Sequence, residues 1–148
     1  MGVVIATTGT RALGVDLGER RIGLALSDPS RTVASPFQVL RRSGDAATDR
    51  RAIVEVAREE GANVIVVGLP LSLSGRAGPA AKAALVEVEA LRAVAGDIEL
   101  VVHDERLTTV TAERALNEAR MRRDARRRVV DKVAAAVMLQ SWLERADR

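Results

Sequence analysis

Three carboxylates stand in or beside segments of the sequence that are otherwise largely apolar. Asp16 lies inside one such segment, Glu105 ends a second and Asp131 begins a third. Burying an unpaired carboxylate costs several kcal/mol, so such a group pairs with another, takes up a proton or binds a cation. Three acids in such settings therefore predict a metal site.

The predicted chemistry follows from the oxygen ligands. Carboxylates at a phosphate site suit Mg²⁺ or Mn²⁺. Two such ions about 3.5 to 4 Å apart can activate a water molecule and stabilise the leaving oxygen of a phosphodiester. We therefore take Asp16, Glu105 and Asp131 as candidate metal-ligating and catalytic residues, and hydrolysis of a phosphodiester as the candidate reaction.

Each acid also has a plainer interpretation. Asp16 could form an Asx turn, and Asp131 could be a charge at a helix N-terminus that the helix dipole favours. Asp104 precedes Glu105 and points to the opposite face if strand alternation persists, so only one of the two is an easy ligand. We choose Glu105.

Two further residues are set aside as ligands. His103 is the only histidine, which leaves no partners for a histidine-rich metal site or a Ser-His-Asp triad, and we interpret it as structural. Asp28 lies about seven residues past a predicted turn, roughly 20 Å from Asp16 at ~3.3 Å per residue.

The elements that must position these acids follow from hydrophobic periodicity and turn residues. Gly18 marks a hairpin turn, Pro36 predicts an edge strand, and the apolar segment 63–68 is typical of a buried central strand. Strands are predicted at 12–17, 21–27, 33–40, 63–68 and 98–103. Helices are predicted at 45–61, 79–95, 108–119 and 131–145, with a basic connector at 120–128.

This order predicts an α/β fold. A three-strand meander is followed by two parallel strands, giving a mixed five-stranded sheet with helices on both faces. The arrangement is that of the ribonuclease-H-like fold. In such a sheet, the acids that follow the first and fifth strands emerge at the same edge.

The distribution of charge points to a polyanion. Of 23 basic residues 21 are arginine, and six of these lie between residues 120 and 128. Guanidinium groups suit phosphate oxygens, although a solvated arginine-rich face would give the same pattern. Phe37 and Trp142 are the only aromatic residues, which disfavours base stacking as the main mode of binding.

Length and composition bound the remaining possibilities. The 148 residues suit one domain, which we place at 12–146 after a short disordered lead-in at 1–11. No apolar stretch reaches the roughly 18 residues expected of a membrane span, and the first residues lack the features of a signal peptide. Together with the absence of cysteine, this favours a cytoplasmic protein without a membrane partner.

The chain resembles the YqgF (RuvX) family, whose members are described as nucleases of pre-16S rRNA and also as Holliday junction resolvases. The matching stretches run in family order. They are GVDLGERRIGLA (14–25), VGLPL (67–71), DERLTT (104–109), DKVAA (131–135) and LQSWL (139–143).

This resemblance implies a ribonuclease-H-like, metal-dependent nuclease that matures the 5′ end of small-subunit ribosomal RNA. It also implies that Asp16, Glu105 and Asp131 are the acidic active-site positions. The expected partner is nucleic acid, either pre-16S rRNA or a 30S precursor, with branched DNA as an alternative, and the expected state is a monomer or homodimer. Candidate substrate contacts are Arg21, Arg106, Thr108, Thr109, Arg126 and Arg127.

One stretch departs from the family pattern. The loop after residue 71 often contains Asn-Met-Asp-Gly in the family, whereas this chain has Ser72-Leu73-Ser74-Gly75 and so lacks the acid. A substrate or metal contact made by that acid would be missing here.

Three other functions compete with the ribosomal RNA nuclease. Resolution of branched DNA would use the same acids and would need a dimer to place two symmetric cuts. A non-catalytic RNA-binding assembly factor would rely on residues 120–128 and would keep its salt-sensitive binding without Asp16. An actin-like phosphotransferase would also carry an acid and a glycine after its first strand, but it would require a second, duplicated domain.

Overall fold

The computed structural model describes residues 10–69, 78–104 and 123–146, and within the last range it describes side chains from residue 132 to 145. Five strands and three helices lie in these ranges. They are β1 (Arg11–Leu17), β2 (Arg21–Ser27), β3 (Ala34–Arg41), α1 (Ala46–Glu59), β4 (Ala62–Leu69), α2 (Pro79–Val94), β5 (Glu99–Asp104) and α4 (Arg123–Ala146).

The strands form one sheet in the order β3-β2-β1-β4-β5. β1, β2 and β3 are antiparallel neighbours, whereas β4 pairs in parallel with β1 and β5 pairs in parallel with β4. This confirms the predicted meander followed by two parallel strands. Pro36 lies in β3 at the sheet edge, as predicted, because a proline cannot donate to a second neighbouring strand.

β4 is an interior strand that is buried on both faces. Val64, Ile65, Val66 and Val67 are each exposed by 1% or less, which matches the prediction from its continuous apolar sequence. The central position belongs to its neighbour β1, which has two strands on either side. Because β1 carries Asp16, the strand with the candidate ligand is held by neighbours along both edges.

The turn between β1 and β2 requires a glycine. The Gly18 amide donates to the Arg21 carbonyl at 3.0 Å, and a Cβ atom on Gly18 would lie 2.5 Å from that same carbonyl oxygen. A side chain at this position would therefore displace the backbone of the turn. The sequence predicted this turn from Gly18 at the centre of the hairpin.

The first two helices begin and end where the sequence indicates. Asp45 caps α1 by accepting a hydrogen bond from the amide of Ala47, and Pro79 opens α2. Gly61 and Gly96 follow these helices with φ values of 75° and 66°, in the left-handed region that glycine adopts without strain.

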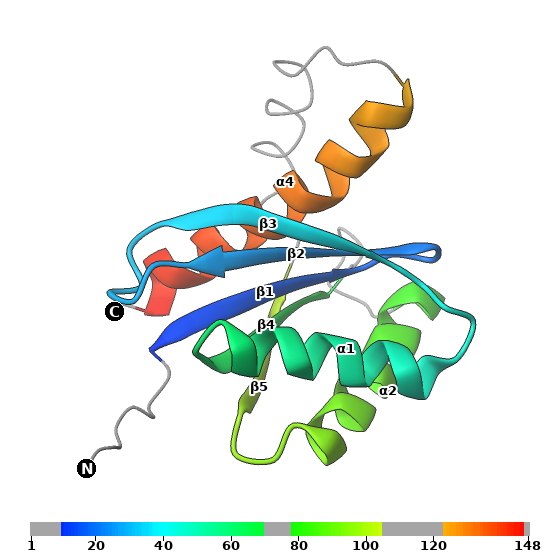
Figure 1. Ribbon diagram of the computed structural model, residues 1–148, viewed down its shortest axis with the longest axis horizontal. Coiled ribbons are helices and arrows are strands. Elements are labelled where there is room, and N and C mark those ends of the chain that lie inside the picture. Colours follow the sequence, from blue (N-terminus) through cyan, green and yellow to red (C-terminus); the bar gives the residue numbers. More distant parts are fainter. Residues whose placement is uncertain (1–9, 70–77, 105–122, 147–148) are drawn as a thin grey trace.

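Helices cover both faces of the sheet (Figure 1), as predicted. On one face, α1 and α2 pack on a core that includes Leu13, Val15 and Ile65. On the other face α4 packs on β1, β2 and β3, with Leu139 at the centre of its contact and fully buried. No helix in the described ranges combines the length and apolar composition required to cross a membrane.

The prediction for the last helix was wrong at its start. α4 already includes Arg123, so residues 123–128 are helical and do not form a connector. Arginine is a good helix former and nothing in this stretch breaks a helix, so high charge alone did not mark a loop. Residues 120–122, the predicted helix 108–119 and the predicted lead-in before residue 10 lie outside the described residues, while Arg11, placed in that lead-in, belongs to β1.

Candidate active site

The parallel strands bring three chain positions to one edge of the sheet. Val15 of β1 pairs with Val67 of β4, which pairs with Val102 of β5. The next residues along these strands are Asp16, Gly68 and His103, and the last two are themselves partners. Asp16 therefore lies at the carboxyl edge of the sheet, where ligands gather in α/β proteins.

Asp16 lies on the face of the sheet that α4 covers. Ala12 packs in the core beneath α4, whereas Leu13 and Val15 pack on the opposite side. Side chains alternate along a strand, so Gly14 and Asp16 belong to the same face as Ala12. Asp16 is half-buried and is a strand residue paired with Gly23, one residue before β1 ends.

Gly14 is the point of close approach between β1 and α4. A Cβ atom at this position would lie 2.9 Å from Cβ of Leu139 and 3.2 Å from the carbonyl oxygen of Ala135. Only a residue without a side chain permits this contact. The backbone of α4 is therefore held close to the strand that carries Asp16.

The direction of α4 places Asp131 toward the same edge as Asp16. Near the other end of the sheet, Gln140 accepts a hydrogen bond from the Ala34 amide at 2.8 Å and donates to the Thr32 carbonyl at 3.0 Å. α4 thus runs opposite to β1, and its earlier turns lie toward the carboxyl end of that strand (Figure 1).

Asp16 and Asp131 lie at similar distances from the contact between β1 and α4 at Gly14. Asp16 lies two residues beyond Gly14, about 6.6 Å at ~3.3 Å per residue. Asp131 lies four residues before Ala135, about 6 Å at ~1.5 Å per residue. The backbone therefore carries positions 16 and 131 in the same direction and by a similar distance from the contact at Gly14.

Along α4, residue 131 is in register with residues that pack on the sheet. It precedes Ala135, Met138 and Leu139 by four, seven and eight residues, and these three side chains are buried against the sheet. It is the ninth residue of α4 as described, well past the first turn, where the dipole acts. The interpretation of Asp131 as an N-terminal helix charge is therefore wrong.

β5 ends with His103 and Asp104, whose side chains lie on opposite faces of the sheet. His103 lies on the α4 face, because its Nε2 atom is 3.0 Å from Oγ of Ser141 in a hydrogen bond. Alternation then places Asp104, the last residue of β5, on the opposite face. Asp104 is thus separated from the face of Asp16, while Glu105 itself lies outside the described residues.

His103 is a buried structural group. Burial lowers its pKa, Arg145 lowers it further, and Asp104 opposes the shift. The imidazole is therefore held neutral more firmly than a free histidine would be.

For most of the other predicted site residues, the structure does not describe the residue or its side chain. Arg106, Thr108, Thr109 and loop residues 72–75 lie outside the described residues, as do the side chains of Arg126, Arg127 and Asp131. Among the residues that are described, no group of three acids, histidines or cysteines is assembled to hold a metal ion.

Arg21 is described and lies near Asp16. Gly23 pairs with Asp16, and Arg21 stands two residues from Gly23 on the same face of the sheet. Such diagonal neighbours on adjacent strands are within reach of a long side chain. The structure thus brings Asp16 and Arg21 to one side of the carboxyl edge.

The sequence reasoning missed a cavity beside the hairpin. It has a volume of about 570 Å³ and is formed by the β1–β2 turn, the end of β3 and the beginning of α1. The signal was present as two arginine doublets at 20–21 and 41–42, which the pairing of adjacent strands brings together. The lining residues are Glu19, Arg20, Arg21, Arg41, Arg42, Gly44, Ala46 and Asp49.

Comparison with known sequences finds one family over almost the whole chain. The sequence model of the RuvX family, described as Holliday junction resolvase, matches residues 10–145. A protein of Nocardia farcinica (strain IFM 10152) named "Putative pre-16S rRNA nuclease" is 42% identical over 139 residues, covering 90% of this chain and 77% of that protein. A protein of the same name from Roseiflexus sp. (strain RS-1) is 41% identical, covering 90% of this chain and 94% of its own length.

Comparison with solved structures supports the fold. Thermus thermophilus RuvC in complex with a Holliday junction substrate superposes with a TM-score of 0.60 at 14% identity, covering 93% of this chain and 96% of that one. The fowlpox virus Holliday junction resolvase gives a TM-score of 0.52 at 11% identity, covering 92% and 99%. At these identities the likeness concerns the ribonuclease-H-like architecture alone.

Proposed function

The chain belongs to the RuvX family, and from this premise we propose that it is a nuclease whose active site is formed by Asp16, Glu105 and Asp131. The family assignment supports a hydrolase acting on phosphodiester bonds. The three site residues are our own assignment.

One observation carries this assignment. The close contact at Gly14 supports it, because the backbone of α4 then carries position 131 toward the same edge of the sheet as position 16. Glu105 follows Asp104, so continued alternation along β5 would return it to the α4 face, with His103. β4 lies between β1 and β5, so two strand spacings of about 4.8 Å each separate them. Asp and Glu side chains can bridge this distance through bound ions.

The donor set fits Mg²⁺ or Mn²⁺. Hard carboxylate oxygens from Asp16, Glu105 and Asp131 would hold the ions, and Asp16 is half-buried in this position. When bound, such ions neutralise charge on the phosphodiester and make water a better nucleophile near neutral pH. Arg21, a diagonal neighbour of Asp16 across the strand pair, would bind a phosphate oxygen through its guanidinium group.

The substrate that we propose is the precursor of 16S ribosomal RNA, cut near the mature 5′ end. The names of the Nocardia and Roseiflexus relatives support this choice, and with this substrate we propose a cytoplasmic location. The arginine-rich beginning of α4 supports binding to a nucleic-acid backbone. The remaining proposed contacts are Arg106, Thr108, Thr109, Arg126 and Arg127.

A Holliday junction is the second candidate substrate. The description of the RuvX family favours it, since it names resolvase activity. The same three acids would cut either substrate, and a resolvase would act as a dimer to make paired cuts.

Cleavage assays test the proposal directly. The wild-type protein and Asp16→Asn would be incubated with an RNA spanning the mature 5′ end and with a four-way DNA junction, in Mg²⁺, Mn²⁺ or EDTA. We expect Asp16→Asn to cut at least about a hundredfold more slowly, because even partners of metal ligands are worth about 10- to 100-fold. Asp97→Asn, a change of an exposed acid between α2 and β5, is the matched control.

The substrate that the wild-type protein cuts efficiently identifies the reaction. Cleavage by Asp16→Asn at the wild-type rate would remove the proposed site.

A further inference from the structure

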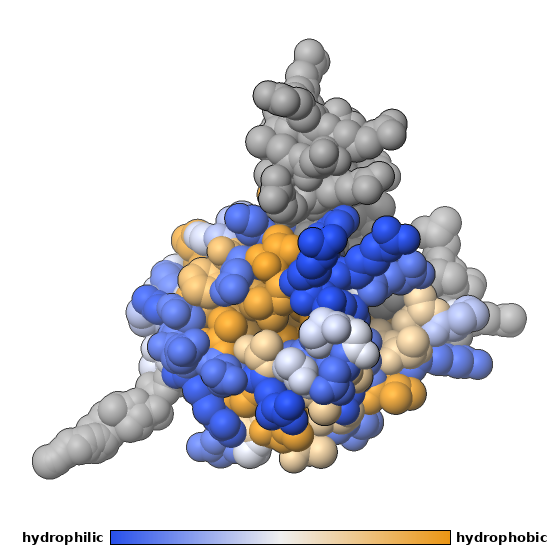
Figure 2. Space-filling model, turned by 45° about the vertical axis from the view of Figure 1, so that its right-hand side comes forward, coloured by the Kyte–Doolittle hydropathy of each residue, from blue (hydrophilic) through white to orange (hydrophobic). Residues whose placement is uncertain are grey.

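The hairpin end of the molecule concentrates arginines around the cavity described above. The side that carries the β1–β2 turn comes forward in Figure 2, and strongly hydrophilic side chains gather there. Four arginines and two acids line the cavity. Among the described residues, the lining contains no aromatic residue and Ala46 has its only apolar side chain, so these residues offer nothing on which a base would stack.

Strand pairing forces these arginines together. Arg21 of β2 is directly opposite Arg41 of β3, and the Arg42 amide donates to the Arg20 carbonyl at 2.9 Å. Like charges that face each other across a strand pair destabilise the sheet. This pairing therefore has an electrostatic cost that a bound anion would remove.

Part of the charge is already compensated within the protein. Arg42 forms an ion pair of 3.0 Å with Glu87 of α2 and also donates to the Gly18 carbonyl at 2.7 Å. Asp49 is buried and accepts a hydrogen bond from the Ser43 amide. These two groups build the wall of the cavity and hold its shape.

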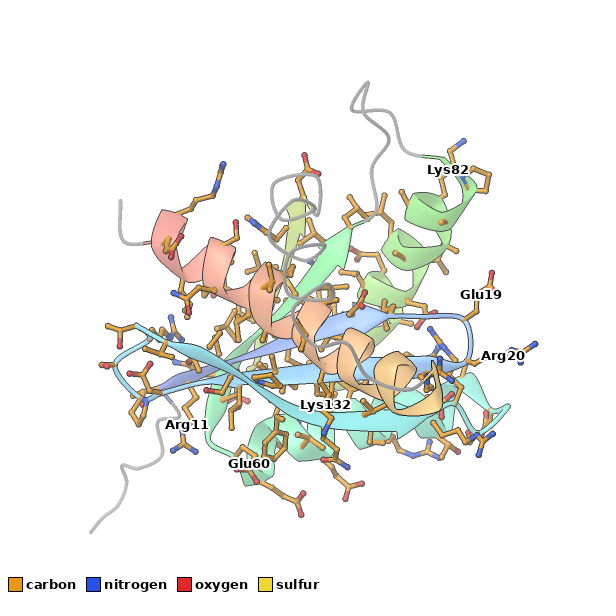
Figure 3. The ribbon with its side chains drawn as sticks, turned by 90° about the horizontal axis from the view of Figure 1, so that it is seen from above. Arg11, Glu19, Arg20, Glu60, Lys82 and Lys132 are labelled. Atoms are coloured by element: carbon orange, nitrogen blue, oxygen red, sulfur yellow. The ribbon has the colours of Figure 1, made fainter. Side chains whose placement is uncertain are left out.

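The charges of Arg20 and Arg41 are not compensated in this way. Both are exposed, and within the described part of the chain neither guanidinium group takes part in a hydrogen bond or ion pair. Figure 3 shows Arg20 and Glu19 extending outward from the turn, at the opposite end of the molecule from Arg11. The cavity therefore presents two accessible cations beside one exposed acid.

The cavity adjoins the proposed active site. Arg41 is two strands from β1 and level with Gly18, which places its Cα atom roughly 12 Å from that of Asp16. At ~3.4 Å per nucleotide along one strand, this corresponds to about three to four nucleotides. Arg21 lies between the two, next to Asp16 and in the lining of the cavity.

We propose that this cavity binds the phosphodiester backbone of the nucleic-acid strand flanking the cleavage site, with Arg20 and Arg41 as its phosphate contacts. The inference rests on the proposed nuclease function and adds a second contact region to it. Guanidinium groups bind phosphate oxygens through paired donors, and backbone contacts carry no sequence information. The site thus fixes the position of the strand and leaves the choice of bond to other features.

The test measures binding without cleavage. Fluorescence anisotropy in EDTA would follow a labelled four-way DNA junction and a labelled RNA hairpin spanning the mature 5′ end, each over a range of salt concentrations. The variants are Arg20→Gln/Arg41→Gln and, with charge retained, Arg20→Lys/Arg41→Lys. The matched control is Arg11→Gln/Arg92→Gln, which removes the same charge far from the cavity.

The expected result is a change in salt dependence. Each lost phosphate contact reduces the slope of log K against log salt by about 0.9 for DNA, so the glutamine double variant should lose about 1.8. The lysine variant should keep most of the slope, and the Arg11/Arg92 control should keep all of it. Far-UV circular dichroism establishes that each variant is folded, and single arginine variants replace any double variant that is not.

Two results would overturn the proposal. One is a glutamine variant that binds both probes with the wild-type slope, and the other is a control variant that loses as much slope as the cavity variant. Cleavage by the wild-type protein in Mn²⁺ is measured separately. A protein that binds through Arg20 and Arg41 but does not cut would refute the nuclease function and leave the contact region standing.

Discussion

Replacing Gly14 by alanine should weaken both the fold and the proposed active site. The new Cβ atom would lie 2.9 Å from Cβ of Leu139, 3.2 Å from the carbonyl oxygen of Ala135 and 3.3 Å from Cδ2 of Leu139. Two of these atoms are fixed to the helix backbone, so a change of side-chain rotamer would not relieve the contact. α4 must move away from β1.

The expected size of the effect follows from overpacking. Forcing an extra methyl group into a filled core costs about 1 to 3 kcal/mol. For a chain of this length each kcal/mol lowers the melting temperature by roughly 2 to 4 °C, so we expect a fall of about 2 to 12 °C. Thermal unfolding followed by circular dichroism at pH 7.5 measures it.

The same displacement should slow cleavage. Moving α4 shifts Asp131 relative to Asp16, and a misplacement of about 1 Å can cost up to about 10²-fold in rate. Gly78→Ala is the matched control, because a Cβ atom at Gly78 meets no described residue within 4 Å. A Gly14→Ala protein that melts and cuts like the wild type, as Gly78→Ala should, would refute the close contact as the device that aligns the two acids.

Three further changes test the structure around the site. Ser27→Ala should cost about 1 to 3 kcal/mol, measured by urea unfolding, because Oγ accepts from the buried Ala12 amide at 2.8 Å; an unchanged midpoint would contradict that bond. Asp28→Asn should lower the melting temperature at pH 7, because hydrogen bonds, the largest from Thr32, depress the Asp28 pKa. The difference in melting temperature between the wild type and this variant should narrow as pH falls below about 3.8, and a constant difference would refute this. Burial lowers the His103 pKa below 6.5, so in mild acid the unfolded chain binds more protons than the folded chain. The wild type should therefore lose more stability than His103→Gln between pH 7.5 and 5.5. Equal losses in thermal melts would refute this prediction.

The fold was predictable because local signals and hydrophobic pattern agreed. Gly18 marked the hairpin, Pro36 marked the edge strand, and the continuous apolar run of β4 marked an interior strand. Each signal has a local physical cause, namely a required glycine, a missing donor or burial on both faces. Such features can be inferred without knowing which elements meet in space.

The beginning of α4 was not predictable in this way. A run of arginines is compatible with a helix or with a connector, and high charge does not distinguish them. Packing of the later turns on β1 provides a nucleus from which the helix extends through Arg123. That long-range contact is visible only in three dimensions.

The candidate site was likewise predictable only in part. Residue chemistry identified Asp16, but only strand register shows that Asp16, Gly68 and His103 share one level and that Asp104 faces away from α4. The arginine cavity depends on the pairing of β2 with β3, so neither doublet indicated it alone. The roles of Asp16, Glu105 and Asp131 as ligands stay predictions.

Anomalous X-ray diffraction from crystals soaked in Mn²⁺ tests the central claim most directly. We predict one or two manganese peaks at the carboxyl edge of the sheet, each bound by oxygen atoms of Asp16 and of at least one of Glu105 and Asp131. These peaks should vanish in crystals of Asp16→Asn. Manganese bound elsewhere, or an ordered edge in which the three carboxylates are too far apart to share ions, would contradict the account.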